Sequence, residues 1–92
     1  MLRIKIEKAT DELLEQLGTE TWNMWSCEPS EFQWEYPEEE ICHILEGRAE
    51  ITTPDCTVEI RQGDIVTFPK GLNCSWKVYE PIHKVYAFRG NL

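Results

Sequence analysis

The sequence predicts an all-β fold, a small antiparallel β-barrel of the double-stranded β-helix or jelly-roll kind with one short N-terminal helix. Short runs of apolar residues, rich in β-branched and aromatic side chains, recur along the chain. Many of these runs alternate with polar residues, and proline or glycine separates most of them. At 92 residues the chain is expected to form one domain that spans residues 1–92.

The N-terminal part combines a strand with the helix. Residues 2–7 alternate apolar and charged side chains, which predicts a half-buried strand at a sheet edge. Thr10 is a typical N-cap residue, three leucines follow it on one stripe, and Gly18 is a typical stop, so we expect a helix of about two turns between them. Trp22 and Trp25 are expected to pack in the core, in an irregular strand or a loop.

The remainder of the chain is predicted to be β-structure. Strands are expected at 31–36, 40–46, 48–53, 57–61, 64–68, 73–79 and 82–89. Gly47 is expected to turn the chain between the second and third of these strands, and Pro81 to separate the last two. The regular spacing of the turns predicts antiparallel hairpins that close into a barrel or a double sheet.

Composition narrows the classes of partner. The net charge of −8 and the pI near 4.6 repel phosphate backbones and anionic lipids, so neither nucleic acid nor membrane is an expected partner. The sequence has no apolar run of transmembrane length and no signal-peptide pattern, so a cytoplasmic location is expected. Without a signal-peptide pattern, the four cysteines are expected to be reduced thiols. Because they contain no C-x-x-C pair, a structural zinc site is not expected.

Two stretches carry a family resemblance. Gly63, Pro69 and Gly71 match the spacing of the second motif of the cupin superfamily, G-x5-P-x-G-x2-H-x3-N. Glu40 and Gly47 match the first motif, H-x-H-x3-E-x6-G. The chain therefore resembles a cupin over most of its length. That resemblance implies a barrel with an interior pocket.

The motif positions that usually bind metal differ in this chain. Trp34 and Tyr36 stand at the two histidine positions of the first motif, Cys74 at the histidine of the second, and Val78 at its asparagine. Within the superfamily the chain resembles the short branch grouped with the cupin domain of ureidoglycine aminohydrolases, whose reaction is metal-dependent. Because most ligand positions are replaced here, neither a metal nor another cofactor is expected.

Glu40 and Tyr36 are the candidate catalytic residues. Glu40 shares a strand face with Cys42, and a carboxylate there is costly to bury unless it is paired, coordinates a cation or is protonated. The alternative is a solvated residue at the strand end. If Glu40 lies unpaired in a pocket, Glu40→Gln is expected to weaken ligand binding while stability at neutral pH stays level or rises. His43 has the opposite parity and is not expected to point inward.

The remaining candidates are expected to line the pocket and bind the ligand. They are Trp34, Cys42, Phe68, Cys74 and Trp76. The aromatic residues have the alternative of simply filling the core of a small barrel. Cys74 is either a nucleophile or, as is more common for a buried thiol, inert.

The predicted function is the binding of a small polar metabolite, by a metal-independent enzyme in which Glu40 is the general acid or base and Tyr36 a hydrogen-bond partner. One alternative is a non-catalytic binding or sensor module, which the missing H-x-H pair favours. The other is an atypical metal-dependent enzyme of the aminohydrolase kind. A homodimer is expected because an edge strand at residues 2–7 tends to find a partner.

Overall fold

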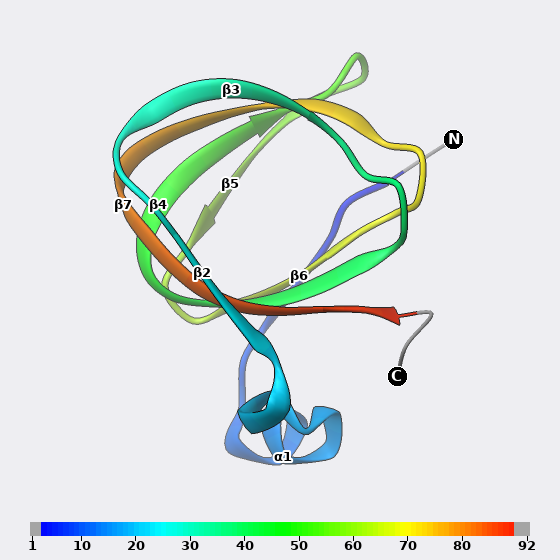
Figure 1. Cartoon of the computed structure of the whole chain (residues 1–92), viewed down its shortest axis with the longest axis vertical. Helices are drawn as coiled ribbons and strands as arrows, with labels where there is room; N and C mark the ends of the chain where they lie inside the picture. The colour runs from blue at the N-terminus through cyan, green and yellow to red at the C-terminus, as the bar shows by residue number, and fades with distance from the viewer. Residues whose placement is uncertain (1–2, 90–92) are drawn as a thin grey trace.

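A computed structural model describes residues 3–89 as a ring of antiparallel strands with one α-helix outside it (Figure 1). The elements in chain order are β1 (Lys5–Lys8), α1 (Asp11–Leu17), a 3₁₀ turn (Thr19–Thr21), β2 (Asn23–Cys27), β3 (Ser30–Glu35), β4 (Glu40–Thr52), β5 (Thr57–Arg61), β6 (Asp64–Phe68) and β7 (Asn73–Phe88). The predicted all-β fold with one short N-terminal helix is confirmed. Leu2, the first residue of the predicted N-terminal strand, lies outside the described residues.

The two longest strands, β4 and β7, pair with each other and form the spine of the barrel. Their pairing runs from Glu40 opposite Phe88 to Thr52 opposite Ser75. One half of this spine is flanked by β6 and β2, with β1 outside β6, and the other half is flanked by β5 and β3. The spine therefore belongs to both sheet layers. The sequence predicted hairpins between neighbouring strands, but of the described pairs only β4 and β5 are consecutive along the chain.

The spine is irregular at Gly47 and Pro81, the residues predicted to separate strands. That prediction was wrong: β4 and β7 are continuous there, and their register shifts between Ile44 and Ala49. Gly47 has a φ of 98°, and a Cβ on it would lie 2.1 Å from the carbonyl oxygen of Pro81. Glycine and proline are both typical of a β-bulge, because the hydrogen-bond ladder between the strands is already interrupted there.

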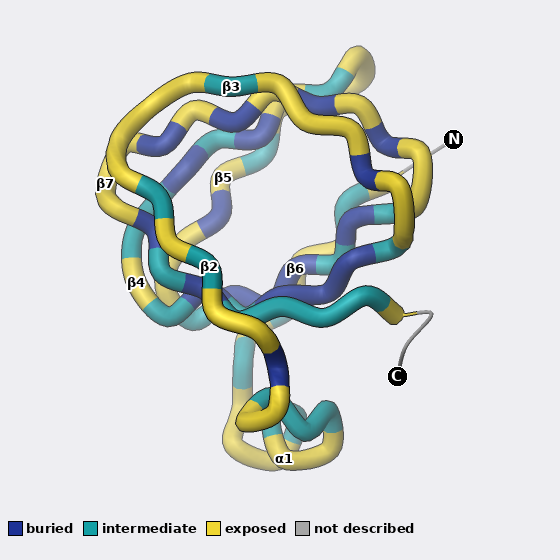
Figure 2. Tube along the Cα trace, viewed as in Figure 1, coloured by how far each residue is buried: buried dark blue, intermediate teal, exposed yellow. Residues whose placement is uncertain are grey.

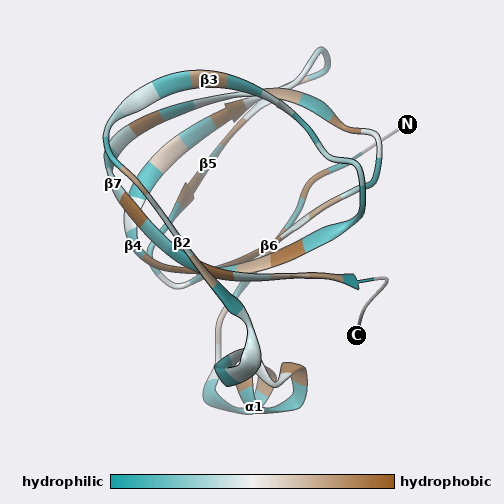
Figure 3. Cartoon of the chain, in the orientation of Figure 1, coloured by the Kyte–Doolittle hydropathy of each residue, from teal (hydrophilic) through white to brown (hydrophobic). Residues whose placement is uncertain are grey.

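The bulge changes which residues of β4 face the interior. Before the bulge, Cys42 and Ile44 are buried in the main core, and after it Ala49 and Ile51 are buried there. The inward-facing residues therefore have even numbers before the bulge and odd numbers after it. Along the first half of β7, buried and exposed residues alternate one by one (Figure 2). Figure 3 shows polar and apolar residues alternating around the ring. The period-2 pattern in the sequence thus records the two faces of the sheet.

Helix α1 lies outside the barrel. It begins after Thr10, whose side-chain oxygen accepts a hydrogen bond from the N–H of Leu13 at 3.1 Å, and it ends at Gly18. Its leucines pack on a small separate cluster of Trp22, Ile41 and Ile65 on the outer face of the sheet. The expected packing of Trp22 in a core is confirmed in this second cluster. No helix within residues 3–89 has the length and apolar character needed to span a membrane.

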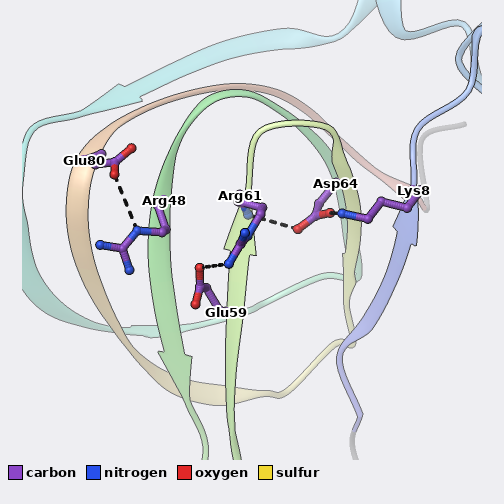
Figure 4. A network of polar contacts seen from close by, with 6 residues as sticks. All are labelled: Lys8, Arg48, Glu59, Arg61, Asp64 and Glu80. Atoms are coloured by element: carbon purple, nitrogen blue, oxygen red, sulfur yellow. Dashed lines mark hydrogen bonds and ion pairs between the residues drawn. The ribbon is translucent and has the colours of Figure 1, made fainter.

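A polar network joins β1 to the turn between β5 and β6 (Figure 4). Asp64, whose side chain is 4% exposed, accepts hydrogen bonds from the backbone N–H of Arg61 at 3.0 Å and from Nζ of Lys8 at 3.3 Å. Arg61 also pairs with Glu59. Because the buried carboxylate of Asp64 is satisfied by donors from two elements, its role is to hold the turn and the edge strand together.

Candidate functional site

A cavity of about 420 Å³ lies at the end of the barrel where β4 begins and β7 ends. Its wall is mostly aromatic. The β2–β3 side contributes Trp25, Phe32, Trp34 and Tyr36. Strand β7 contributes Trp76, Tyr86 and Phe88. Trp34 is 51% exposed and stands at the rim, whereas Tyr36 and Trp76 are almost fully buried. A concave, largely apolar site with few polar groups is typical of small-molecule binding.

Two charged residues, Glu40 and Lys84, complete the cavity wall and form a buried ion pair. Nζ of Lys84 donates a hydrogen bond to Oε2 of Glu40 at 2.8 Å, and the two side chains are 6% and 8% exposed. In a site of low dielectric each charge needs the other, because neither has water to solvate it. Of the alternatives for a buried Glu40, the structure shows the paired one, so the condition under which Glu40→Gln was expected to keep or raise stability is not met.

Aromatic rings surround the ammonium group of Lys84. Its Nζ lies 4.9 Å from the ring centroid of Trp25 and 5.0 Å from that of Trp76, with Tyr86 at 5.7 Å and Phe68 at 5.9 Å. The negative faces of such rings attract a cation, most strongly where water is excluded. The structure thus provides a place for one positive charge, held by one carboxylate and by several ring faces.

Tyr36 supplies a neutral hydroxyl to the same cavity. Burial, and next the nearby Glu40 carboxylate, hold the pKa of Tyr36 well above its usual value, so the phenol keeps its proton. Nε1 of Trp76 donates a hydrogen bond to the Tyr36 oxygen at 3.3 Å, and the Tyr36 ring stacks on Phe68 with centroids 4.5 Å apart. Among residues 3–89 no acceptor takes the Tyr36 proton, so it is free to bond a ligand oxygen.

The two candidate cysteines lie outside the cavity wall. Cys42 is fully buried in the main core, where burial raises its pKa to about 12 despite the opposing effect of Lys84. Cys74 is buried beside the backbone of Trp34, and burial raises its pKa to about 11. Since thiolates are the nucleophilic form, both groups are protonated and unreactive at neutral pH. The inert alternative for Cys74 is the one that this geometry supports.

Cys74 borders a second hollow, a groove of about 690 Å³ between β3 and the turn after β4. Its lining residues other than Cys74 and Thr53 are exposed. They include polar side chains such as Gln33, Thr52 and Ser75. A groove of this kind is shared by many protein surfaces, whereas the cavity combines a buried ion pair with aromatic walls. We therefore take the cavity as the candidate site.

Comparison with known proteins agrees with this architecture. The model of the EutQ-like cupin domain matches residues 14–86, which is most of the chain. The chain belongs to this family. This cupin is also 52% identical to a DUF861 family protein of Thermotoga maritima, with a TM-score of 0.91 over 94% of this chain and 99% of that one.

More distant structures share the cupin fold. The EutQ protein of Clostridium difficile is 19% identical, with a TM-score of 0.65, and the alignment covers 92% of this cupin and 66% of that chain. A putative ethanolamine utilization protein of Salmonella typhimurium is 20% identical, with a TM-score of 0.64 and coverage of 90% and 66%. At these identities the likeness concerns the fold alone. No curated protein matches this cupin.

The residues of this cupin do not fit the metal centre that the cupin motifs imply. The motif positions of the histidines hold Trp34, Tyr36 and Cys74, and the carboxylate of Glu40 already binds Lys84. Within residues 3–89 no three His, Cys, Asp or Glu side chains lie close enough together to hold an ion. His43 lies on the opposite face of β4, and burial there lowers its pKa. A lysine ammonium thus sits against the one motif carboxylate that remains.

The structure brings together only part of the predicted site. Glu40, Tyr36, Trp34 and Trp76 line the cavity, and Phe68 lies directly behind Tyr36. Sequence reasoning missed Lys84 and the aromatic residues Phe32, Tyr86 and Phe88, and it assigned Trp25 to the core alone. One signal was present in the sequence. Lys84 has the same strand parity as Ile82, Tyr86 and Phe88, so a charged residue interrupts an otherwise apolar face.

Proposed function

We propose that this cupin binds a small polar metabolite in the aromatic cavity and acts on it without a metal ion. The observation that carries the proposal is the ion pair of Glu40 and Lys84, which is buried in the protein and yet borders the cavity. A buried charge pair seldom increases stability over apolar residues of the same volume, so its presence in a pocket points to a task other than folding.

Each residue of the cavity has a role that follows from its chemistry. Glu40 accepts or donates a proton, because its carboxylate faces the ligand space and is already hydrogen-bonded to a proton donor. Tyr36 donates its hydroxyl proton to a ligand oxygen, and the indoles of Trp25 and Trp76 contact the flat or apolar part of the ligand. A metabolite with one polar end and a small apolar body fits these walls.

A non-catalytic binding or sensor module is the second candidate. It is supported by the short distance of 2.8 Å between Nζ of Lys84 and Oε2 of Glu40, because the two charges neutralise each other without any ligand. The two proposals differ in one measurement, since an enzyme converts its ligand and a sensor returns it unchanged. The aminohydrolase branch is a weaker proposal, because a metal ion would have to replace Lys84 at the Glu40 carboxylate.

Tryptophan fluorescence provides the test, because three of the four indoles line the cavity. We expect a panel of small polar metabolites to include compounds that change the emission, and Glu40→Gln to weaken their binding at least tenfold. Such a loss corresponds to about 1.4 kcal/mol. Glu39→Gln is the matched control, because Glu39 is the preceding residue and pairs with Arg89 at the surface. Equal affinity in the parent and in Glu40→Gln would refute the proposal.

We also propose that this cupin acts as a cytoplasmic homodimer. The proposal is supported by β1, which lies at one end of the strand order and pairs with β6 on one side only among the described strands. Ile6 on this strand is 38% exposed, so an apolar side chain lies at the sheet edge. Pairing of two β1 strands about a twofold axis would cover both edges.

A further inference from the structure

Lys84 differs from every other lysine of the chain. Lys5, Lys8, Lys70 and Lys77 are exposed on the outside of the molecule, whereas Lys84 is buried and borders the cavity. Its Nζ lies 2.8 Å from the carboxylate of Glu40. A primary amine in an apolar pocket beside a proton acceptor has the chemistry of a nucleophile toward carbonyl carbon. The cavity therefore offers a covalent attachment point as well as a binding surface.

We propose that Lys84 forms a Schiff base with an aldehyde or ketone that enters the cavity, an inference that rests on the proposed function of the cavity as a ligand site. The ligand class is thus a small carbonyl compound with an apolar or aromatic body, which the surrounding rings contact. Glu40 is the group that moves the protons between the two steps of the reaction.

The reaction balances with the residues present. Glu40 first takes a proton from the Lys84 ammonium, which leaves a free amine. The nitrogen lone pair attacks the carbonyl carbon, the carbonyl π electrons move to oxygen, and a proton passes from nitrogen to that oxygen to give a carbinolamine. Glu40 then returns its proton to the hydroxyl group, the C–O bond breaks, and water leaves. The product is an iminium ion, and no oxidant, reductant or second reactant is needed.

The surroundings of Lys84 suit this product. The ammonium and the iminium each carry one positive charge on the same nitrogen, so the reaction leaves the charge of the site unchanged. The carboxylate of Glu40 and the faces of Trp25 and Trp76, which lie 4.9 and 5.0 Å from the nitrogen, stabilise either cation. Because the rings exclude bulk water, they also slow hydrolysis of the iminium back to the amine.

Reductive trapping tests the proposal. The protein is incubated with limiting benzaldehyde and sodium cyanoborohydride, which reduces an iminium to a stable secondary amine, and labelled lysines are then quantified by peptide mass spectrometry. We expect Lys84 to be labelled at least tenfold faster than Lys5, Lys8, Lys70 or Lys77, which act as internal controls. Labelling of Lys84 that is no faster than that of the exposed lysines would overturn the inference.

Variants locate the chemistry. Lys84→Arg should abolish the fast labelling, whereas Lys77→Arg, the matched exposed change, should leave it intact. Glu40→Gln should slow labelling of Lys84 at least tenfold, because proton transfer is lost while the amine remains. Unchanged labelling in Glu40→Gln would overturn the proton-transfer role assigned to Glu40. The circular dichroism spectrum of each variant shows whether it is folded.

Benzyl alcohol separates failure of this inference from failure of the proposed function. It resembles benzaldehyde in size and shape but cannot form a Schiff base. One outcome is that benzyl alcohol changes the tryptophan emission while benzaldehyde fails to label Lys84. In that case the cavity binds ligands, and the proposed Schiff base is wrong. If neither compound changes the emission, no compound of the metabolite panel does so and Lys84 is not labelled, both proposals fail.

Discussion

Glu40 and Lys84 carry opposite charges in a place that water hardly reaches, so each is stable only while the other is present. Removing one partner of a buried pair leaves a single unsolvated charge, whereas removing both leaves none. The stability of the barrel should therefore depend on the two residues jointly. Because Glu40 is paired, its replacement should lower stability, in contrast to the level or higher stability expected for an unpaired carboxylate.

We expect Glu40→Gln to lower the free energy of unfolding at neutral pH by about 3 kcal/mol, because Lys84 loses its counter-ion. Lys84→Met should cost a similar amount for the converse reason. The double variant should be more stable than the sum of the single losses by about 1–3 kcal/mol. Urea denaturation of the four proteins measures this coupling. Additive losses would mean that the two charges do not stabilise each other.

The thiols give a second prediction at this scale. Burial raises the pKa of Cys74 to about 11 and that of Cys42 to about 12, so both remain protonated at pH 8. Iodoacetamide at pH 8 should therefore label the exposed Cys56 in the folded protein and leave Cys42 and Cys74 unmodified. Peptide mass spectrometry checks the sites, and unfolding in urea should make all cysteines reactive. Rapid modification of Cys74 in the folded protein would restore it as a candidate nucleophile.

The sequence located part of the site because a motif fixes backbone positions. Glu40, Trp34 and Trp76 stand at or beside motif positions on strands, and Tyr36, at another motif position, directly follows β3. Lys84 was missed because its role depends on a partner 44 residues away, and no local pattern gives that distance. Cys42 has the correct parity for the interior, but parity does not distinguish residues that fill a core from residues that border a cavity.

At the scale of the elements, the bulge at Gly47 decides how β4 crosses from one layer of the barrel to the other. It changes the inward parity of the strand, so both halves of β4 present apolar residues to the same core. The sequence showed an apolar pattern that broke at glycine, and a turn and a bulge both produce such a break. The bounds of β5 and β6 were predicted as they are found, because proline, glycine and polar residues form the turns on either side of them. The strand predicted at residues 2–7 is instead found at Lys5–Lys8.

Gly47→Ala should be strongly destabilising, by about 3 kcal/mol or more, because an added Cβ combines a strained positive φ with a clash of 2.1 Å against the Pro81 carbonyl oxygen. Gly63→Ala is the matched control. Gly63 also has a positive φ, of 92°, but a Cβ there meets nothing within 4 Å, so only backbone strain of about 1 kcal/mol is expected. Thermal melts compare the two variants, and equal losses would show that the contact with Pro81 is unimportant.

At the scale of the whole molecule, the free edge of β1 should control association. We expect Ile6→Glu to convert the dimer to a monomer, because the two introduced carboxylates would repel each other across the paired β1 edges. Met24→Glu is the control, since Met24 is exposed on β2, at the opposite end of the strand order. Light scattering at tens of micromolar, about the range in which modest interfaces associate, measures the state. A monomeric parent protein would refute the dimer.

The central position of β7 has a consequence for synthesis of the protein on the ribosome. Among the described strands β2 and β3 pair only with β7, and β4 pairs with β7 along one edge, where its first residue lies opposite Phe88. Contacts of such long sequence separation form slowly, because the intervening chain must first be ordered. A nascent chain that lacks β7 would leave β2 and β3 without a partner strand and one edge of β4 unpaired. The barrel should therefore fold only after residue 88 has left the exit tunnel, and until then these edges are open to chaperones or to aggregation.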